Sequence, residues 1–265
     1  MIRKVLFSMV VFVCVNVVQA HEFWLEPTKF VFKVGETMEM KFLVGENFNG
    51  KDWEIEPGKV ARLDHFIGGA EEDLASKISI PDKKLSVRLA REGTHLFSLR
   101  SNNSFIELEA EEFNDYLKSD GQDDILQQRE QNNELDKAAK EYYARCAKLL
   151  VQAGDSRDET YKKVAGLPLE IIPLNNPYSL EVTDQVSFQL LFQGRPLPFA
   201  LVRVWNRTPG RTFIQKIYTE KDGTFTTRLS SKGVWMISTV KMIESRQPGA
   251  DYQSFWASLV FGFNQ

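Results

Sequence analysis

Short runs in which apolar and polar residues alternate are the feature that most constrains the fold of this chain. The clearest run covers residues 37–44, where Met38, Met40 and Phe42 fall on one side and charged residues on the other. A period of two is typical of a strand that buries one face. Similar runs recur in both halves of the chain, separated by turns that contain Gly, Asn or Pro. The pattern predicts a mainly β protein built from sandwiches.

The stretch between the two β-rich parts has a different composition. Residues 123–152 contain no Pro or Gly and place apolar residues at three- and four-residue intervals, which predicts a long helix lying across a sheet. Residues 111–117 predict a shorter amphipathic helix. We therefore expect two β-sandwich domains joined by a helical segment. The expected boundaries are 1–20 for a signal peptide, 21–110 for the first domain, 111–166 for the helical insert and linker, and 167–265 for the second domain.

The first 20 residues have the composition of a cleaved export signal. Arg3 and Lys4 make a basic start, residues 5–18 are almost all apolar, and Ala20 supplies the small residue that signal peptidases require. The apolar run is too short for a comfortable membrane span, which needs about 20 residues. The mature chain is therefore expected to begin at His21 and to carry no transmembrane anchor.

An N-terminal histidine has a specific chemistry. Cleavage before His21 would give this residue a free α-amine, with an ordinary pKa of roughly 7.7–8.0, next to its imidazole. One residue could then chelate a metal ion through two nitrogens, and a further imidazole would complete a flat site that suits Cu(II) or Ni(II). The plainer interpretation is that a signal peptide happens to end before a histidine.

Two other histidines are available as ligands, because the chain contains three in total. We therefore predict a metal site formed by His21, His95 and His65. Carboxylates near these histidines could add an oxygen ligand or orient an imidazole; the candidates are Glu22, Glu26 and Asp64.

Charge and cysteine content exclude several classes of protein. The chain has 33 Lys and Arg against 36 Asp and Glu, which gives no basic face for nucleic acid. After cleavage Cys146 would be the single cysteine, since Cys14 lies in the signal, so no disulfide can form within the chain. Cys146 is expected to be a buried structural thiol. The sequence has no phosphate-binding glycine loop, dinucleotide motif or serine nucleophile elbow.

Several motifs resemble known families. Residues 194–202 and 219–225 resemble transthyretin-like and carboxypeptidase-regulatory-like modules, which implies an immunoglobulin- or transthyretin-like second sandwich. Residues 21–27, with Gly93-Thr94-His95 and residues 143–148, are similar to a bacterial periplasmic family of unknown function formerly labelled as nickel-uptake components. The resemblance implies a periplasmic location and a role in metal handling, with His21 and His95 matching the family pattern. His65 has no such counterpart.

Three functions follow from these observations. The first is a periplasmic protein that binds or handles copper or nickel, with a membrane transporter or another periplasmic protein as partner. The second adds redox catalysis at the same metal, although the chain is more consistent with a non-enzyme. The third is a non-catalytic β-sandwich module that binds a partner protein or a glycan without metal.

Overall fold

The computed structural model describes residues 22–263, so His21 lies outside the described residues. The described chain is mainly β, with two α-helices and several sheets. The helices are α1 (Ala110–Ser119) and α2 (Asp123–Gln131), with 3-10 turns η1 (Ala75–Lys77), η2 (Thr160–Lys162) and η3 (Pro177–Ser179). The strands are β1 (Glu22–Pro27), β2 (Val31–Phe32), β3 (Thr37–Glu46), β4 (Asn49–Asp52), β5 (Val60–Ile67), β6 (Ala70–Asp73), β7 (Lys84–Arg88), β8 (Gly93–Ser101), β9 (Ser104–Leu108), β10 (Ala139–Ala153), β11 (Leu169–Pro173), β12 (Gln185–Phe192), β13 (Arg195–Pro196), β14 (Leu201–Thr208), β15 (Arg211–Tyr218), β16 (Thr224–Arg228), β17 (Val234–Glu244) and β18 (Tyr252–Gly262).

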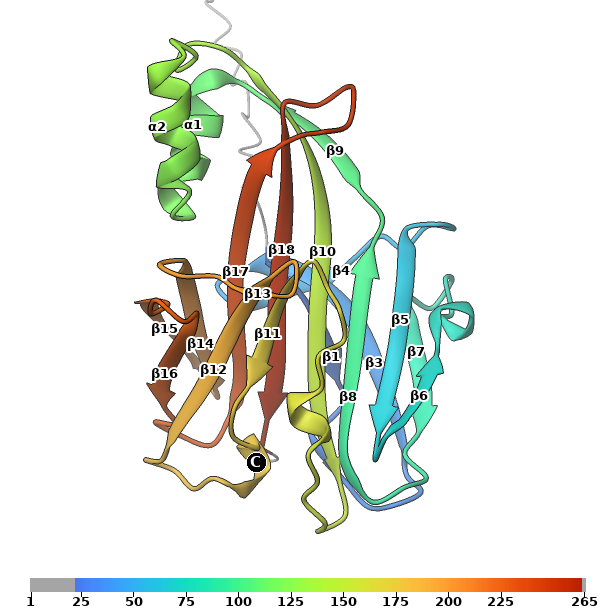
Figure 1. Ribbon diagram of the computed structural model, residues 1–265. Coiled ribbons are helices and arrows are strands. Elements are labelled where there is room, and N and C mark those ends of the chain that lie inside the picture. The colour runs from blue at the N-terminus through green and yellow to red at the C-terminus, as the bar shows by residue number, and fades with distance from the viewer. Residues whose placement is uncertain (1–21, 264–265) are drawn as a thin grey trace, which may run out of the picture.

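A ten-stranded sheet runs through the whole molecule (Figure 1). Its main order is β15-β14-β17-β18-β10-β8-β5-β6, and β2 and β9 also pair with β10. Strands from the first and last parts of the chain therefore share one sheet, and β10 joins them by pairing with β18 in parallel and with β8 antiparallel.

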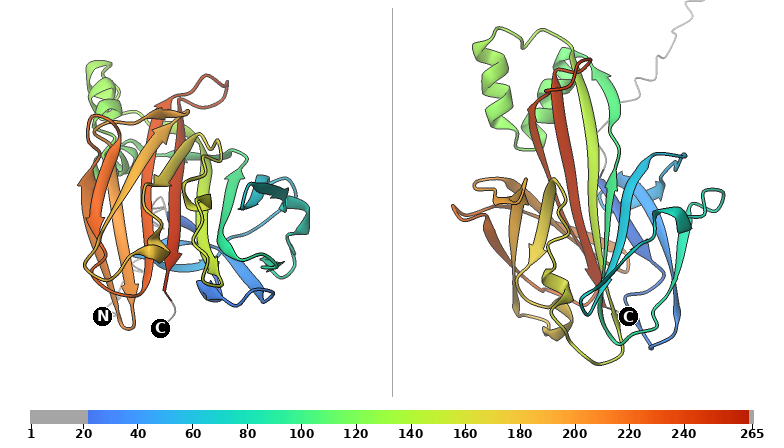
Figure 2. Two further views of the ribbon diagram at one scale, coloured as in Figure 1. Left: turned by 60° about the horizontal axis from the view of Figure 1, so that its bottom comes forward. Right: turned by 45° about the vertical axis from the view of Figure 1, so that its right-hand side comes forward.

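Two smaller sheets cover opposite faces of this central sheet. Figure 2 shows the blue strands β1 and β3 on one side and the yellow and orange strands β11 and β12 on the other. The first small sheet contains β1, β3, β4 and β7, and the second contains β11, β12, β13 and β16. Each encloses its own apolar core, one around Trp24, Phe42 and Phe97 and the other around Phe188 and Phe261. The arrangement confirms the mainly β sandwich fold, with both sandwiches sharing the central sheet.

Strand β10 corrects the expected long helix. Helix α2 ends at Gln131, and the 15 residues from Ala139 to Ala153 form a strand. The expectation of helix is wrong there because β10 is buried on both faces, so its apolar residues do not alternate. Cys146 is free and buried, as expected, but it lies on this strand. The domain boundaries at residues 110 and 167 stay predictions.

The shorter helical prediction is confirmed by α1, which packs with α2 over one end of the central sheet (Figure 1). Phe113 and Leu117 of α1 and Ile125 of α2 form a small core with Met242 and Tyr252 of the sheet. This helical cap lies beside the place where β1 begins. Among residues 22–263, no helix is both long and apolar enough to cross a membrane.

Candidate functional site at the start of strand β1

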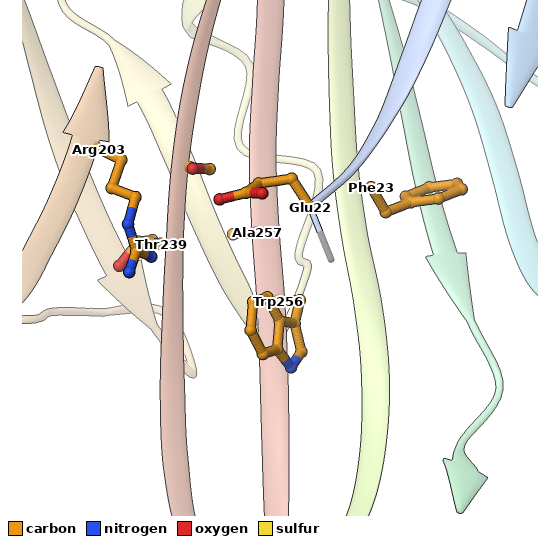
Figure 3. A pocket seen from close by; sticks show the side chains of 7 residues that line it. Glu22, Phe23, Arg203, Thr239, Trp256 and Ala257 are labelled. Atoms are coloured by element: carbon orange, nitrogen blue, oxygen red, sulfur yellow. The ribbon is translucent and has the colours of Figure 1, made fainter. Parts of the chain in front are cut away.

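The start of β1 lies over a small hollow in the central sheet, seen in Figure 3. Glu22 begins the strand, whose register pairs it with Gly45 of β3. The hollow is lined by Glu22, Phe23, Arg203, Ser238, Thr239, Trp256 and Ala257, contributed by β1, β14, β17 and β18. Its volume is about 10 Å³, enough for a single water molecule or a small ion.

Arg203 is held in place from the helical cap. Its guanidinium donates to Oδ1 of Asp120 at 2.6 Å and to the carbonyl oxygen of Ser119 at 2.7 Å. Both acceptors lie at the C-terminal end of α1, where the helix dipole favours a cation. Because Asp120 partly neutralises the charge of Arg203, the guanidinium stabilises the carboxylate of Glu22 less than an unpaired cation would.

Glu22 is therefore a partly buried carboxyl group without a full counter-charge. Its pKa is raised to about 7, mainly by burial; its own backbone N–H and Arg203 limit the rise, and the nearby carboxylates of Asp120 and Glu46 add to it. The balance means that the ionised form of Glu22 is poorly stabilised near neutral pH.

A second carboxyl group with a raised pKa, that of Glu141, lies near Trp256. Glu141 of β10 accepts hydrogen bonds from Ser254 Oγ and from Tyr116 Oη, the latter at 3.3 Å. Burial raises the pKa of Glu141 to about 7, and the two hydroxyl donors limit the rise. Burial likewise raises the pKa of Tyr116 well above its ordinary value.

The indole of Trp256 connects the two carboxyl groups. Its Nε1 donates to Ser254 Oγ at 3.1 Å, and its ring stacks on Tyr116 with centroids 5.8 Å apart. The same indole forms one wall of the hollow at Glu22 (Figure 3). We define the group of Glu22, Asp120, Glu141, Arg203 and Trp256 as the β1 acidic cluster.

The structure brings His65 and His95 together, but as a hydrogen-bonded pair. Nε2 of His65 lies 2.8 Å from Nδ1 of His95, and Nε2 of His95 lies 2.9 Å from the carbonyl oxygen of Arg91. Since that oxygen only accepts, His95 carries its proton on Nε2 and accepts from His65 through Nδ1. Both nitrogens of His95 are thereby used. Burial lowers the pKa of both histidines, that of His65 to about 4.

The histidine pair and the β1 acidic cluster lie at different positions along β10. Trp256 of the cluster pairs with Arg145, whereas His95 pairs with Val151, six residues further along the strand. At 3.3 Å per residue this separates the two places by about 20 Å. Whether His21 approaches His95 stays a prediction, because residue 21 is outside the described chain.

The other predicted oxygen ligands have partners of their own. Glu26 accepts from Nε1 of Trp24 at 2.7 Å and forms an ion pair with Arg207. Asp64 forms an ion pair with Arg62. Within residues 22–263, no group of three or more His, Cys, Asp or Glu side chains is arranged to hold a metal ion. Of the three predicted carboxylates, Glu22 alone lies in the cluster.

Sequence reasoning missed most of the cluster. Glu141 falls in the stretch 123–152 that was predicted to be a long helix, and no sequence pattern singled out Asp120, Arg203 or Trp256. The one available signal was the run from Cys146 to Val151, which is almost entirely apolar and typical of a central strand. Recognising that strand would have placed Glu141 inside the molecule.

The fold and the cluster together define a mainly β protein in which two sandwiches share a central sheet, with a group of acidic side chains near the start of its first described strand. The chain belongs to a family described as a domain of unknown function, DUF4198, whose model matches residues 18–242. A search of curated proteins found no match.

Proposed function

We propose that this protein binds a transition-metal ion, copper or nickel, at the start of β1 and handles it in the periplasm. The observation that carries the proposal is the position of Glu22, a partly buried carboxyl group without a full counter-charge, directly after the histidine predicted to be the mature N-terminus. A bound cation would stabilise the ionised form of Glu22, which its surroundings disfavour.

The donor set fits a borderline metal. The α-amine and imidazole of His21 would supply two nitrogens, and the carboxylate of Glu22 is one residue away along the chain. Nitrogen donors of this kind suit Cu(II) and Ni(II). The carboxylate of Glu141 would add negative charge near the ion without contacting it, whereas Asp120 is already paired with Arg203.

In this proposal His65 and His95 have a structural role. Their rings stack on each other and, through His65, on Phe97, a residue of the core around Trp24 and Phe42. Because both nitrogens of His95 are in hydrogen bonds, ligation by His95 would require this pair to open.

Titration calorimetry with Cu(II) and Ni(II) tests the proposal on the chain that begins at His21. We expect a single site that is lost when one alanine is added before His21, since the α-amine would then lie on a different residue. Glu22→Gln should weaken binding by about ten- to 100-fold, the usual effect of removing a group that supports a metal ligand.

Two controls separate this site from the alternatives. Glu39→Gln removes an exposed carboxylate from the neighbouring strand β3 and should leave the affinity unchanged. His95→Ala should also retain binding at a temperature where the variant is folded. Equal affinity of the alanine-extended chain would contradict the proposal, and loss of binding in His95→Ala alone would move the site to the histidine pair.

A further inference from the structure

Strand β15 is an outer strand with one backbone edge that no other described strand pairs with. Among residues 22–263 it pairs with β14 alone and ends the ten-stranded sheet, at the margin of the molecule in Figure 1. Every residue of β15 except Ile217 is exposed, and Phe213, Ile214 and Tyr218 are 54%, 48% and 57% exposed. Outer strands are normally shortened, bulged or covered, because an open strand edge pairs with other chains.

The hydrogen-bond register shows which backbone groups face outward. Thr219 N–H donates to the carbonyl oxygen of Ala200 at 3.0 Å, just beyond the pair of Leu201 and Tyr218. Bonded and non-bonded pairs alternate in an antiparallel ladder, so Tyr218 and every second residue before it direct their N–H and C=O away from β14. These residues are Thr212, Ile214, Lys216 and Tyr218. Four successive positions therefore present an open ladder.

The charge of this hairpin is opposite to that of the chain. The two strands and their turn, residues 201–218, contain four cations and no Asp or Glu, although the whole chain has an excess of acidic residues. Arg203 and Arg207 are paired with Asp120 and Glu26. Within the described residues, Arg211 and Lys216 form no ion pair.

We infer that β15 is a docking edge for an extended acidic segment of a partner protein, which would add to the sheet as a further strand. The open ladder would supply main-chain hydrogen bonds, and the exposed apolar side chains would contact alternate residues of the segment. Arg211 and Lys216 would pair with its carboxylates. A second copy of this chain is a poorer occupant, because pairing β15 with itself would bring four unpaired cations to one seam.

Fluorescence anisotropy with the mature chain tests this inference. The probe is a labelled, end-blocked peptide of alternating Glu and Val, and the matched probe replaces each Glu by Lys. We expect the acidic peptide to bind and the basic one not to bind. Arg211→Glu with Lys216→Glu should abolish binding, whereas Lys51→Glu with Lys137→Glu, an equal charge change elsewhere on the surface, should leave it within about twofold.

Proline substitution tests the backbone pairing itself. Ile214→Pro removes an outward N–H without removing a bond to β14, and Ile214→Ala removes the same side chain but keeps the N–H. The proline variant should bind about tenfold more weakly than the alanine variant. In the unaltered protein, amide exchange of Ile214 and Lys216 should slow on peptide binding, which is a readout that needs no variant.

Three results would overturn the inference. Equal binding of the two Ile214 variants, together with unprotected amides, would exclude strand addition. Equal binding of the basic peptide would exclude recognition by charge. A dimer in light scattering that dissociates on Ile214→Pro would assign the edge to a second copy of the chain. Metal titration of the same variants keeps this test independent of the proposed metal site.

Discussion

The two faces of β10 bury charge in opposite ways. On one face Lys148 and Glu170 are each 1% exposed and form an ion pair of 2.9 Å. Glu170 also accepts from the backbone N–H groups of Ala165, Gly166 and Leu167. Lys148 donates to two further carbonyl oxygens. Both charges of this pair therefore have a partner of opposite sign and several further hydrogen bonds.

On the other face Glu141 has hydroxyl donors, and no cation of residues 22–263 pairs with it. Burial is nearly as complete as for Glu170, yet the pKa of Glu141 rises to about 7. The contrast teaches that burial alone does not distinguish a structural charge from one available for function. What differs is whether the fold itself supplies the opposite charge. The Lys148–Glu170 pair should therefore matter for stability, and the β1 acidic cluster should respond to pH and to added cations.

Breaking the Lys148–Glu170 ion pair should have the largest effect on stability. Lys148→Met leaves the carboxylate of Glu170 buried without its cation and should lower the free energy of unfolding by about 3–5 kcal/mol. Urea denaturation at pH 7 measures this change. The double variant Lys148→Met with Glu170→Gln should recover part of the loss, because no unpaired charge remains. Equal loss in the single and double variants would show that packing, and not charge, holds this face together.

Removing the charge of Glu141 should raise the stability of the protein rather than lower it. The pKa of Glu141 is about 7 in the folded protein and 4.5 ordinarily, so the folded state binds more protons between these values. Its contribution to stability is full below pH 4.5 and is lost as the pH rises through 7. Glu141→Gln should therefore stabilise the protein at pH 8, by about 3 kcal/mol at most. Denaturation of both proteins at pH 4.5 and 8 measures the difference, and the exposed change Glu130→Gln serves as the control.

The histidine pair should give a pH dependence in the reverse direction. His65 has a pKa of about 4 in the folded protein against 6.5 ordinarily, so the unfolded chain binds more protons between these values. Stability should fall as the pH drops from 6.5 to 4, by about 3 kcal/mol at most for His65. His65→Phe keeps a ring against Phe97 and should reduce the fall in stability between pH 6.5 and pH 4. An unchanged slope in that variant would mean that other groups cause acid unfolding.

The sequence predicted the strands that bury one face and missed those that bury two. Met38, Met40 and Phe42 alternate with charged residues, and β3 forms where expected. Strand β10 lacks this alternation, and its Ala, Leu, Lys and Glu residues are good helix formers. Its neighbours β8 and β18, far away in the sequence, override that local preference.

The β1 acidic cluster illustrates the same limit for sites. Glu22 was named because it follows His21, which is a local signal. Asp120, Glu141 and Arg203 come from separate parts of the chain and meet only because β10, β14 and α1 surround β18 and the start of β1. No spacing rule relates these three positions, since their approach depends on the long-range strand order.

The smallest effect in this comparison should come from a hydroxyl group. Ser254 Oγ donates to Glu141 and accepts from Nε1 of Trp256, so it is the link between the carboxyl group and the wall of the hollow. The hydrogen bond from Ser254 Oγ lowers the pKa of Glu141, and Ser254→Ala should therefore raise that pKa further. The loss of stability in Ser254→Ala should grow from pH 5 to pH 8, because the ionised carboxylate of Glu141 depends on the hydroxyl donor more than the neutral acid does. The loss should reach about 1–3 kcal/mol. Ser258→Ala, on the same face of β18, lacks a carboxylate partner in the described structure and should show no such growth. A pH-independent loss in Ser254→Ala would mean that the hydroxyl stabilises the protein only through its hydrogen bond to Trp256. It would also mean that Glu141 stays protonated from pH 5 to pH 8.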